Sequence, residues 1–275
     1  MSRYMEKPDV VVIGGGVAGL SAATWLGRHR IPTVVVDSGE YRNKWVEKAH
    51  GYLGMDAISP AELLEKARMD LKRYGSVTIR KSTVNKIKVF GGGFEVEVPE
   101  GPISCGRIIL ATGVVDAFPQ VEGFFDYYGK SIFHCPMCDG YETQGKSVAV
   151  IGWSREAAAL AATISNWAAN ATLVTDGEHL RTSPKDEEDL AKLGVEIVTG
   201  EASALEGENG ELSGLRLESG ELVECQMAFF SIGNSPAPEL PDMLGLERTD
   251  EGSVAVDSNG ETSVKGVYAA GDMTP

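Results

Sequence analysis

Short runs of β-branched residues alternate along this chain with stretches that carry apolar residues at helical spacing. The pattern predicts a strand, a glycine turn, a helix and a second strand that closes on an acid. Four elements within about 30 residues are typical of a βαβ unit. Their positions are Val10–Ile13, Gly14–Gly19, Leu20–Arg28 and Thr33–Val36, with Asp37 as the closing acid.

The same order returns in the second half of the chain, where it closes on Asp176, 24 residues after the first glycine (152 to 176) against 23 in the first half (14 to 37). Each half then continues with a polar helix, a short strand, glycine-rich hairpin residues and an apolar strand. A connector over 114–146 is expected to lie outside the repeat. In the second unit, the strand, helix and strand are predicted at 147–151, 156–168 and 171–175. The later helix, short strand and apolar strand are predicted at 60–74, 77–80 and 108–113 in the first half, and at 184–193, 195–198 and 229–233 in the second.

This repeat predicts an α/β protein with two Rossmann-like, doubly wound, three-layer nucleotide-binding domains, the second inserted in the first. The first domain is expected to hold residues 1–114 and 237–275, and the second residues 115–236. A single long α/β domain is the alternative, because 275 residues suit one large domain or two of ordinary size.

Composition supports a globular chain, since 43% of the residues are apolar and 24% are charged. The net charge of −15 argues against nucleic acid as a partner, because phosphate binding needs clustered Lys and Arg. Residues 201–275 hold 15 Asp and Glu against 3 Lys and Arg, which is typical of a solvated surface.

The first ten residues lack the apolar core of a secretory signal, and no apolar run is long enough to cross a membrane. We therefore expect a cytoplasmic protein without a membrane partner. The four cysteines are too few for a disulfide framework. Only one pair is close in sequence, and no second CxxC motif completes a zinc site, so no metal is expected.

The first glycine turn has the context that dinucleotide binding needs. Gly14 permits the tight turn, Gly16 lets backbone amides approach a pyrophosphate, and Gly19 lets the helix pack closely on the strand. The helix N-terminus offers unpaired N–H groups to the phosphates, and Asp37 is placed to bond a ribose hydroxyl. The alternative is a glycine-rich turn in an unrelated βαβ unit.

The second glycine turn departs from the motif. Ser154 stands at the second glycine position and Trp153 adds bulk beside it. Asp176 favours an unphosphorylated ribose, as in NADH, and only Arg181 is near enough in sequence for a 2′-phosphate. This half is therefore expected either to bind NADH imperfectly or to keep the fold without the ligand.

The connector carries the pair Cys135 and Cys138, whose spacing allows a disulfide across one turn. At a helix start such thiols have lowered pKa values and act in redox exchange. A zinc site that includes His134, or purely structural thiols, are the alternatives. Asp139 follows directly, and it either exchanges a proton with the departing thiol or serves as a turn residue.

Three further residues have open roles. His50 lies in a small-residue loop that can run along a flavin, although a solvent-facing or core histidine fits the sequence equally well. Cys105 and Cys225 lie at strand-like positions and are expected to be small buried residues.

Together these motifs resemble the low-molecular-weight thioredoxin reductase family over nearly the whole chain. The matching segments are Gly14–Gly19, Ala111–Gly113, Cys135–Gly140 and Val267–Asp272. The resemblance implies non-covalent FAD in the first domain, an NAD(P)-binding-like second domain with a redox disulfide that faces the flavin, and a homodimer.

The same resemblance implies roles for single residues. Asp272 would bond the ribityl chain, Asp139 would be the acid beside the flavin-facing Cys138, and Cys135 would attack the substrate disulfide. The expected catalytic residues are thus Cys135, Cys138 and Asp139. The expected cofactor-binding residues are Gly14, Gly16, Ala18, Gly19, Asp37, Ser38, Asn43, His50, Ala111, Thr112, Gly113, Gly271 and Asp272.

Three departures from the family pattern matter. Residues 175–178 stand where the family has a His-Arg-Arg cluster for NADPH, so NADH and NADPH both stay open. Arg42-Asn43 and residues 50–54 look like the branch of dithiol oxidases, although that branch commonly has His where this chain has Asp139. The sequence ends at Pro275, where the family continues into a helix over the flavin, so one flavin wall is expected to be incomplete.

The sequence therefore predicts an FAD-dependent dithiol–disulfide oxidoreductase of thioredoxin reductase type. Its partner would be a thioredoxin-like protein or a small-molecule dithiol or disulfide. An oxygen-using dithiol oxidase, or a ferredoxin-dependent reductase that does not use NADPH, is the alternative within enzymes. A non-catalytic, redox-responsive flavoprotein is the alternative of another class.

Overall fold

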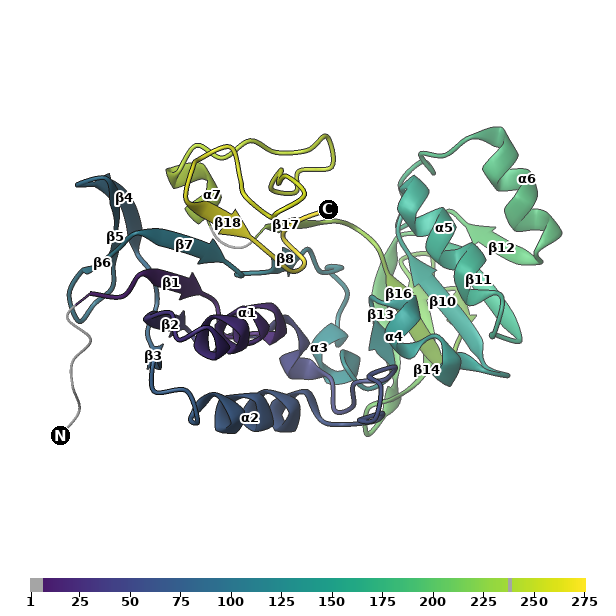
Figure 1. Ribbon diagram of the computed structural model, residues 1–275. Coiled ribbons are helices and arrows are strands. Elements are labelled where there is room, and N and C mark those ends of the chain that lie inside the picture. Colours follow the sequence, from purple (N-terminus) through teal and green to yellow (C-terminus); the bar gives the residue numbers. More distant parts are fainter. Residues whose placement is uncertain (1–6, 237–238) are drawn as a thin grey trace. The chain divides into compact units, whose positions relative to one another are not determined.

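The computed structural model describes residues 7–236 and 239–275, which form two compact units (Figure 1). The first unit contains residues 7–44, Ala61–Asp116 and the chain from Asn234 onwards, and the second contains Trp45–Pro60 and Ala117–Gly233. The second is thus inserted in the first, as predicted. Residues 45–60, which the sequence analysis placed with the first domain, pack with the second unit. Residues 1–6 and the predicted boundary at 237 lie outside the described residues.

A five-stranded parallel sheet with the order β18-β7-β1-β2-β3 forms the centre of the first unit. A three-stranded antiparallel sheet, β4-β5-β6, and a two-stranded ladder, β8-β17, accompany it. The strands are β1 (Val10–Ile13), β2 (Thr33–Asp37), β3 (Val77–Lys81), β4 (Lys86–Phe90), β5 (Gly93–Glu97), β6 (Ile103–Cys105), β7 (Arg107–Leu110), β8 (Val114–Asp116), β17 (Asn234–Pro236) and β18 (Val267–Ala269). The helices are α1 (Val17–Arg28), η1 (Arg42–Trp45), α2 (Pro60–Leu71) and α7 (Leu240–Met243).

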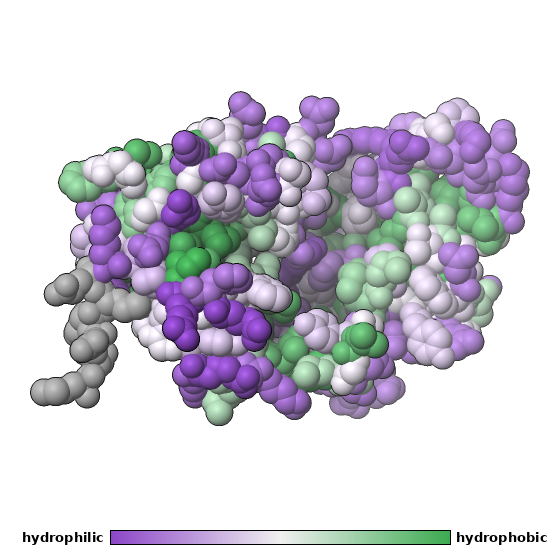
Figure 2. Space-filling view, viewed as in Figure 1, coloured by the Kyte–Doolittle hydropathy of each residue, from purple (hydrophilic) through white to green (hydrophobic). Residues whose placement is uncertain are grey.

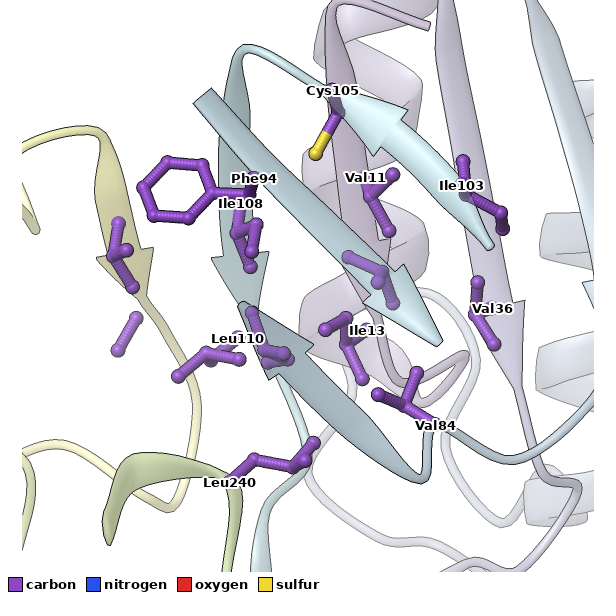
Figure 3. Close-up of a cluster of buried hydrophobic side chains, with 14 of the residues drawn as sticks. Val11, Ile13, Val36, Val84, Phe94, Ile103, Cys105, Ile108, Leu110 and Leu240 are labelled. Carbon is purple, nitrogen blue, oxygen red and sulfur yellow. The ribbon is translucent and has the colours of Figure 1, made fainter. Parts of the chain in front are cut away.

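Both faces of this parallel sheet are buried, which explains why β1 is apolar throughout rather than alternating. Val10 and Val12 share a cluster with Leu20 of α1 and with side chains of α2. Val11 and Ile13 share the opposite cluster with side chains of the antiparallel sheet and of β7 (Figure 3). The helices, the parallel sheet and the antiparallel sheet are therefore three layers.

The second unit repeats this plan around a parallel sheet of order β12-β11-β10-β16-β9 and an antiparallel sheet β13-β14-β15. The strands are β9 (Ile132–Phe133), β10 (Ser147–Ile151), β11 (Asn170–Val174), β12 (Val195–Val198), β13 (Ala202–Glu208), β14 (Glu211–Leu217), β15 (Leu222–Glu224) and β16 (Met227–Phe230). The helices are α3 (Phe124–Tyr127), α4 (Pro136–Asp139), η2 (Tyr141–Thr143), α5 (Arg155–Ile164) and α6 (Pro184–Lys192).

The connector over 114–146 does not lie wholly outside the repeat, so that prediction was wrong in part. Its strand β9 takes the edge of the second parallel sheet that β18 takes in the first. Two residues are too short for a periodicity signal, and their neighbour β16 comes from almost 100 residues later. None of the helices in the described ranges is long and apolar enough to cross a membrane.

Helix α6 lies on the surface and carries mostly charged residues, which Figure 2 shows as a hydrophilic area. It begins with a capping box, in which the Ser183 side chain accepts from the Asp186 backbone N–H and the Asp186 carboxylate accepts from the Ser183 N–H. We expect Ser183→Ala to lower the free energy of unfolding by about 1 kcal/mol, because it removes this cap. Chemical denaturation would measure the loss. Ser258→Ala, in an exposed turn, is the control and should change it little. Equal stability of the two variants would contradict the capping role.

Candidate functional site

A disulfide joins Cys135 and Cys138 at α4, with the two Cα atoms 5.3 Å apart. Cys135 caps this single helical turn, and its carbonyl oxygen accepts from the backbone N–H groups of Cys138 and Asp139, each at 3.2 Å. Cys135 is half-buried and Cys138 is exposed. The predicted redox pair is therefore formed within one short, hydrogen-bonded turn.

Asp139 follows the disulfide and is buried, with 7% of its surface exposed. Burial, and then the negative charge of Glu142, raise the pKa of Asp139 to about 6, while His50 acts in the opposite direction. A carboxyl group with this pKa is partly protonated near neutral pH. It can therefore donate a proton as well as accept one, which an ordinary surface aspartate cannot do.

His50 belongs to the second unit, in the 45–60 segment. Its Nδ1 lies 3.5 Å from Oδ1 of Asp56, and its Nε2 lies 3.6 Å from Oε1 of Glu142. The Gly51 N–H donates to the same Asp56 oxygen at 2.9 Å and holds the turn. His50 thus lies between two carboxylates, and its predicted flavin contact stays a prediction. The sequence analysis missed Glu142, although it lies three residues after Asp139, the spacing of one helical turn.

The other two cysteines are buried, free thiols, as predicted. Burial raises the pKa of Cys105 to about 11 and that of Cys225 to about 12. Both stay protonated at neutral pH and are unreactive. Among residues 7–236 and 239–275, no group of three or more His, Cys, Asp or Glu side chains is arranged to hold a metal ion.

The glycine turn between β1 and α1 is closed at Gly14, Gly15 and Gly19 and open at Gly16, and a Cβ on Gly15 would lie 2.3 Å from the Asp37 carboxyl group. A Cβ on Gly14, where φ is +108°, would lie 2.2 Å from the Ala111 carbonyl oxygen, and one on Gly19 would lie 1.9 Å from the Gly14 oxygen. Gly16 has extended backbone, and a Cβ there would meet nothing within 4 Å. No side chain caps α1 at Gly16. This turn therefore leaves room for a ligand at the start of a helix.

Three predicted segments meet around this turn. Gly14 and Gly19 approach Ala111, and a Cβ on Gly271 would lie 2.8 Å from the Ala18 side chain. The segments follow the carboxyl ends of the neighbouring parallel strands β1, β7 and β18. That edge is where doubly wound sheets bind nucleotides. Thr112 and Gly113 belong to the same group of segments.

Asp37 lies buried at the end of β2, where three groups donate to its carboxylate. They are the Gly39 N–H at 3.0 Å, the Tyr41 hydroxyl at 2.5 Å and an Arg68 N–H at 3.3 Å. Arg68 also donates to the Tyr41 hydroxyl. Burial, together with the bond to Asp37, raises the pKa of Tyr41 to about 12. Arg68 comes from α2, so no sequence spacing indicated it.

Arg42 joins two carboxylates of the first unit. Its Nε and Nη2 donate to both oxygens of Asp116, at 2.8 and 2.6 Å, and its Nη1 donates to Asp272 at 2.9 Å. Asp272, expected at the ribityl chain, is thereby held from a distant segment. Ser38 is exposed after β2, and Asn43 is half-buried in η1.

The glycine turn of the second unit is occupied by its own residues. The Ser154 side chain caps α5 by accepting from the Ala157 N–H at 3.3 Å. Glu156 lies in the first turn, and its bond to Ser154 lowers the pKa of Glu156, which keeps it anionic. Asp176, in left-handed backbone, accepts from the Ala202 N–H at 2.8 Å. The start of α5 therefore already has a side-chain cap and a nearby negative charge, unlike the start of α1.

Two Rossmann-like units, one with an open nucleotide turn and the other with a CxxC disulfide beside a buried acid, define a flavin-disulfide type of oxidoreductase. Residues 8–275 match the family described as pyridine nucleotide-disulphide oxidoreductase, and the chain belongs to this family.

Its relatives are thioredoxin reductase-like. The chain is 34% identical to thioredoxin reductase tcpT of Claviceps purpurea over 96% of its own length and 86% of the relative's. It is 29% identical to the thioredoxin reductase of Treponema pallidum over 96% and 88% of the two chains. The crystal structure of HlmI superposes with a TM-score of 0.91 at 32% identity, covering 99% of this chain and 86% of that one.

Family membership makes this chain an oxidoreductase and a flavoprotein, and implies FAD and a pyridine nucleotide. The first unit fits FAD, because the space at Gly16 is open and α1 begins without a side-chain cap. The second unit does not offer a comparable fit to a pyridine nucleotide, because Ser154 caps α5 and Glu156 places a negative charge in its first turn.

Proposed function

We propose that this protein is an FAD-dependent dithiol–disulfide oxidoreductase of thioredoxin reductase type. Electrons would pass between FAD and the Cys135–Cys138 pair, and from there to or from a thioredoxin-like protein or a small-molecule thiol. The observation that carries the proposal is a disulfide followed directly by a buried acid whose pKa is raised to about 6. The alternative of a non-catalytic flavoprotein is not adopted, because the family is one of enzymes.

The residues that would hold FAD lie in the first unit. The pyrophosphate would lie at Gly16 against the α1 amides, where the helix dipole favours negative charge. Asp37, oriented by Tyr41 and Arg68, would accept from a ribose hydroxyl. Asp272, held by Arg42, would bond the ribityl chain. When bound, FAD supplies a carrier for two electrons.

The thiol steps follow from the disulfide and its neighbour. The Cys135 thiolate would attack a substrate disulfide, forming a mixed disulfide and releasing one substrate thiolate. The Cys138 thiol, losing its proton to the Asp139 carboxylate, would then attack the Cys135 sulfur. This closes the Cys135–Cys138 disulfide and releases the second substrate thiolate, which takes a proton. The substrate gains two electrons and the protein pair loses two.

The same steps run in reverse when a dithiol reduces the protein. The dithiol attacks the Cys135–Cys138 bond, and protonated Asp139 would give its proton to the departing thiolate. The dithiol is then oxidised to a cyclic or protein disulfide, and both protein thiols are formed. The exposed Cys138 and half-buried Cys135 are compatible with attack from outside the second unit.

A second candidate is a dithiol oxidase or a ferredoxin-dependent reductase, neither of which takes electrons from a nicotinamide. The observation that favours it is the second unit's glycine turn. Its Ser154 side chain already caps α5, and Glu156 adds a negative charge in the first turn, so this helix start is less suited to a pyrophosphate than that of α1. Four assignments stay predictions. They are FAD binding by residues 1–114 and 237–275, an NAD(P)-binding-like role of residues 115–236, a homodimer and a cytoplasmic location.

Anaerobic mixing tests the function and separates the two candidates. We expect dithiothreitol to bleach the flavin absorbance of the purified protein. We expect NADH and NADPH to do so at least about fivefold more slowly, because loss of the Ser154 cap costs about 1 kcal/mol and 1.4 kcal/mol is tenfold. Bleaching by neither dithiol nor nicotinamide would contradict the proposed function. Bleaching by a nicotinamide as fast as by dithiothreitol would contradict only the second candidate.

A further inference from the structure

Asp56, His50 and Glu142 form a run of close contacts in the second unit, and the buried Asp139, which follows the disulfide, lies three residues before Glu142. Asp139 ends α4, and Glu142 follows one turn later in η2. His50 lies between Glu142 and Asp56, at 3.6 and 3.5 Å. Asp56 is exposed, with 70% of its side chain accessible, whereas Asp139 is buried. The contacts therefore run from the exposed Asp56 to Glu142, whose charge acts on Asp139.

Glu142 has an unusual environment within this group. Its Oε1 faces His50, while its Oε2 is buried and has no hydrogen-bond partner among the described residues. A buried carboxylate oxygen without a partner is costly. The other oxygen of Glu142 faces His50, and the charges of these two residues act on Asp139 in opposite directions.

We propose that His50 and Glu142 are positioning residues that set the protonation state of Asp139, and with it the pH range in which the Cys135–Cys138 pair exchanges electrons with a dithiol. The inference rests on the proposed function, since it assigns Asp139 as the proton donor and acceptor. It gives His50 a role at the disulfide that the sequence did not indicate.

The two residues act on Asp139 with opposite signs. The Glu142 anion favours the protonated form of Asp139, and the protonated His50 favours its ionised form. Apart from Asp56, the other charged residues of the 45–60 segment are Glu47 and Lys48, and α5, which also packs against α4, carries its only two charges, Arg155 and Glu156, in its first turn.

The expected shifts follow from these signs. When a dithiol reduces the disulfide, the reactive form of Asp139 is the protonated one. The rate per dithiol thiolate should therefore fall as pH rises through the pKa of Asp139, which is about 6. Glu142→Gln removes the anion that raises this pKa, so the decrease in the reduction rate should occur at a pH lower by about 0.5–1 unit. His50→Gln removes the cation that lowers the pKa of Asp139, so the decrease in the reduction rate should occur at a higher pH, by a similar amount.

The experiment measures the thiols directly. The holoenzyme is mixed anaerobically with dithiothreitol between pH 5 and 9, quenched in acid and alkylated, and the two new cysteine adducts are counted by mass spectrometry. Each rate is divided by the thiolate fraction of dithiothreitol. The variants are His50→Gln, Glu142→Gln and Asp139→Asn. The controls are Glu47→Gln, in the same segment, and His29→Gln, at the end of α1.

Opposite shifts for His50→Gln and Glu142→Gln, with unchanged controls, are the expected result. Shifts in the same direction, or none, would overturn the inference, provided that Asp139→Asn removes the pH step. A pH step that survives in Asp139→Asn would show that Asp139 is not the proton donor and would overturn the inference, whereas failure of dithiothreitol to bleach the flavin at any pH would contradict the proposed function itself. If His50→Gln does not fold, His50→Asn replaces it, and the decrease in rate should again move to higher pH.

Discussion

Cys138→Ser should leave the protein yellow and unable to exchange electrons with dithiols. A serine hydroxyl forms no disulfide, so the pair loses its two-electron chemistry while the FAD-binding residues of the first unit are unchanged. The bleaching of the flavin by dithiothreitol is expected to slow by at least about 10³-fold, as for loss of a catalytic nucleophile. The flavin absorbance of the purified variant and the anaerobic bleaching rate are the two measurements.

Cys105→Ser is the matched control, since it makes the same chemical change at a buried thiol away from the disulfide. It should bleach at the wild-type rate, although an extra hydroxyl in the core lowers its stability. Bleaching of the Cys138 variant at the rate of this control would show that the disulfide does not carry the electrons.

Gly16→Val is the second change with a large expected effect. The backbone at Gly16 is extended and the space around it is open, so the side chain should be accommodated in the FAD-free fold. It would then occupy the volume proposed for the pyrophosphate. Overpacking costs about 1–3 kcal/mol, which is about 5–150-fold in FAD affinity. Titration of the FAD-free protein with FAD, followed by flavin fluorescence, would measure the loss.

Ser154→Val makes the comparable change at the same position of the second glycine turn. It removes the α5 cap, but it should leave FAD affinity unchanged, because the proposed flavin site lies in the other unit. Equal loss of FAD affinity in both variants would contradict the assignment of FAD to the first unit. Normal affinity of Gly16→Val would show that the pyrophosphate does not bind at this turn.

The sequence predicted the central strands and the internal repeat because those features are local. Buried parallel strands are continuous apolar runs, and β10 and β12 begin and end where the pattern indicated. The helix after β10 was predicted to reach Ala168 but ends at Ile164. Ser165 and Asn166 bond their side chains to carbonyls of the last turn and so compete with helix continuation.

The side-chain clusters could not be predicted in the same way. Asp37 was recognised from its place after a strand, but Arg68 reaches it from a helix 31 residues away. His50 and Glu142 meet across more than 90 residues, and only the fold brings them to one place. A sequence motif shows only which residue types are close along the chain. The fold determines which charged side chains lie near them, and those charges determine the pKa values and hydrogen bonds of the motif residues.

The β8–β17 ladder makes the inserted segment easier to exchange by protein engineering. The chain leaves the first unit after Asp116 and returns at Asn234, and these two residues are paired partners in the ladder. The host unit is therefore already closed across the insertion, and a tight hairpin turn would be enough to join its two halves. An insertion with adjacent ends can be exchanged for another domain without rebuilding its host. Residues 117–233, which carry the disulfide, can in this sense be exchanged as one segment, but the 45–60 segment that packs with them would have to be exchanged as well.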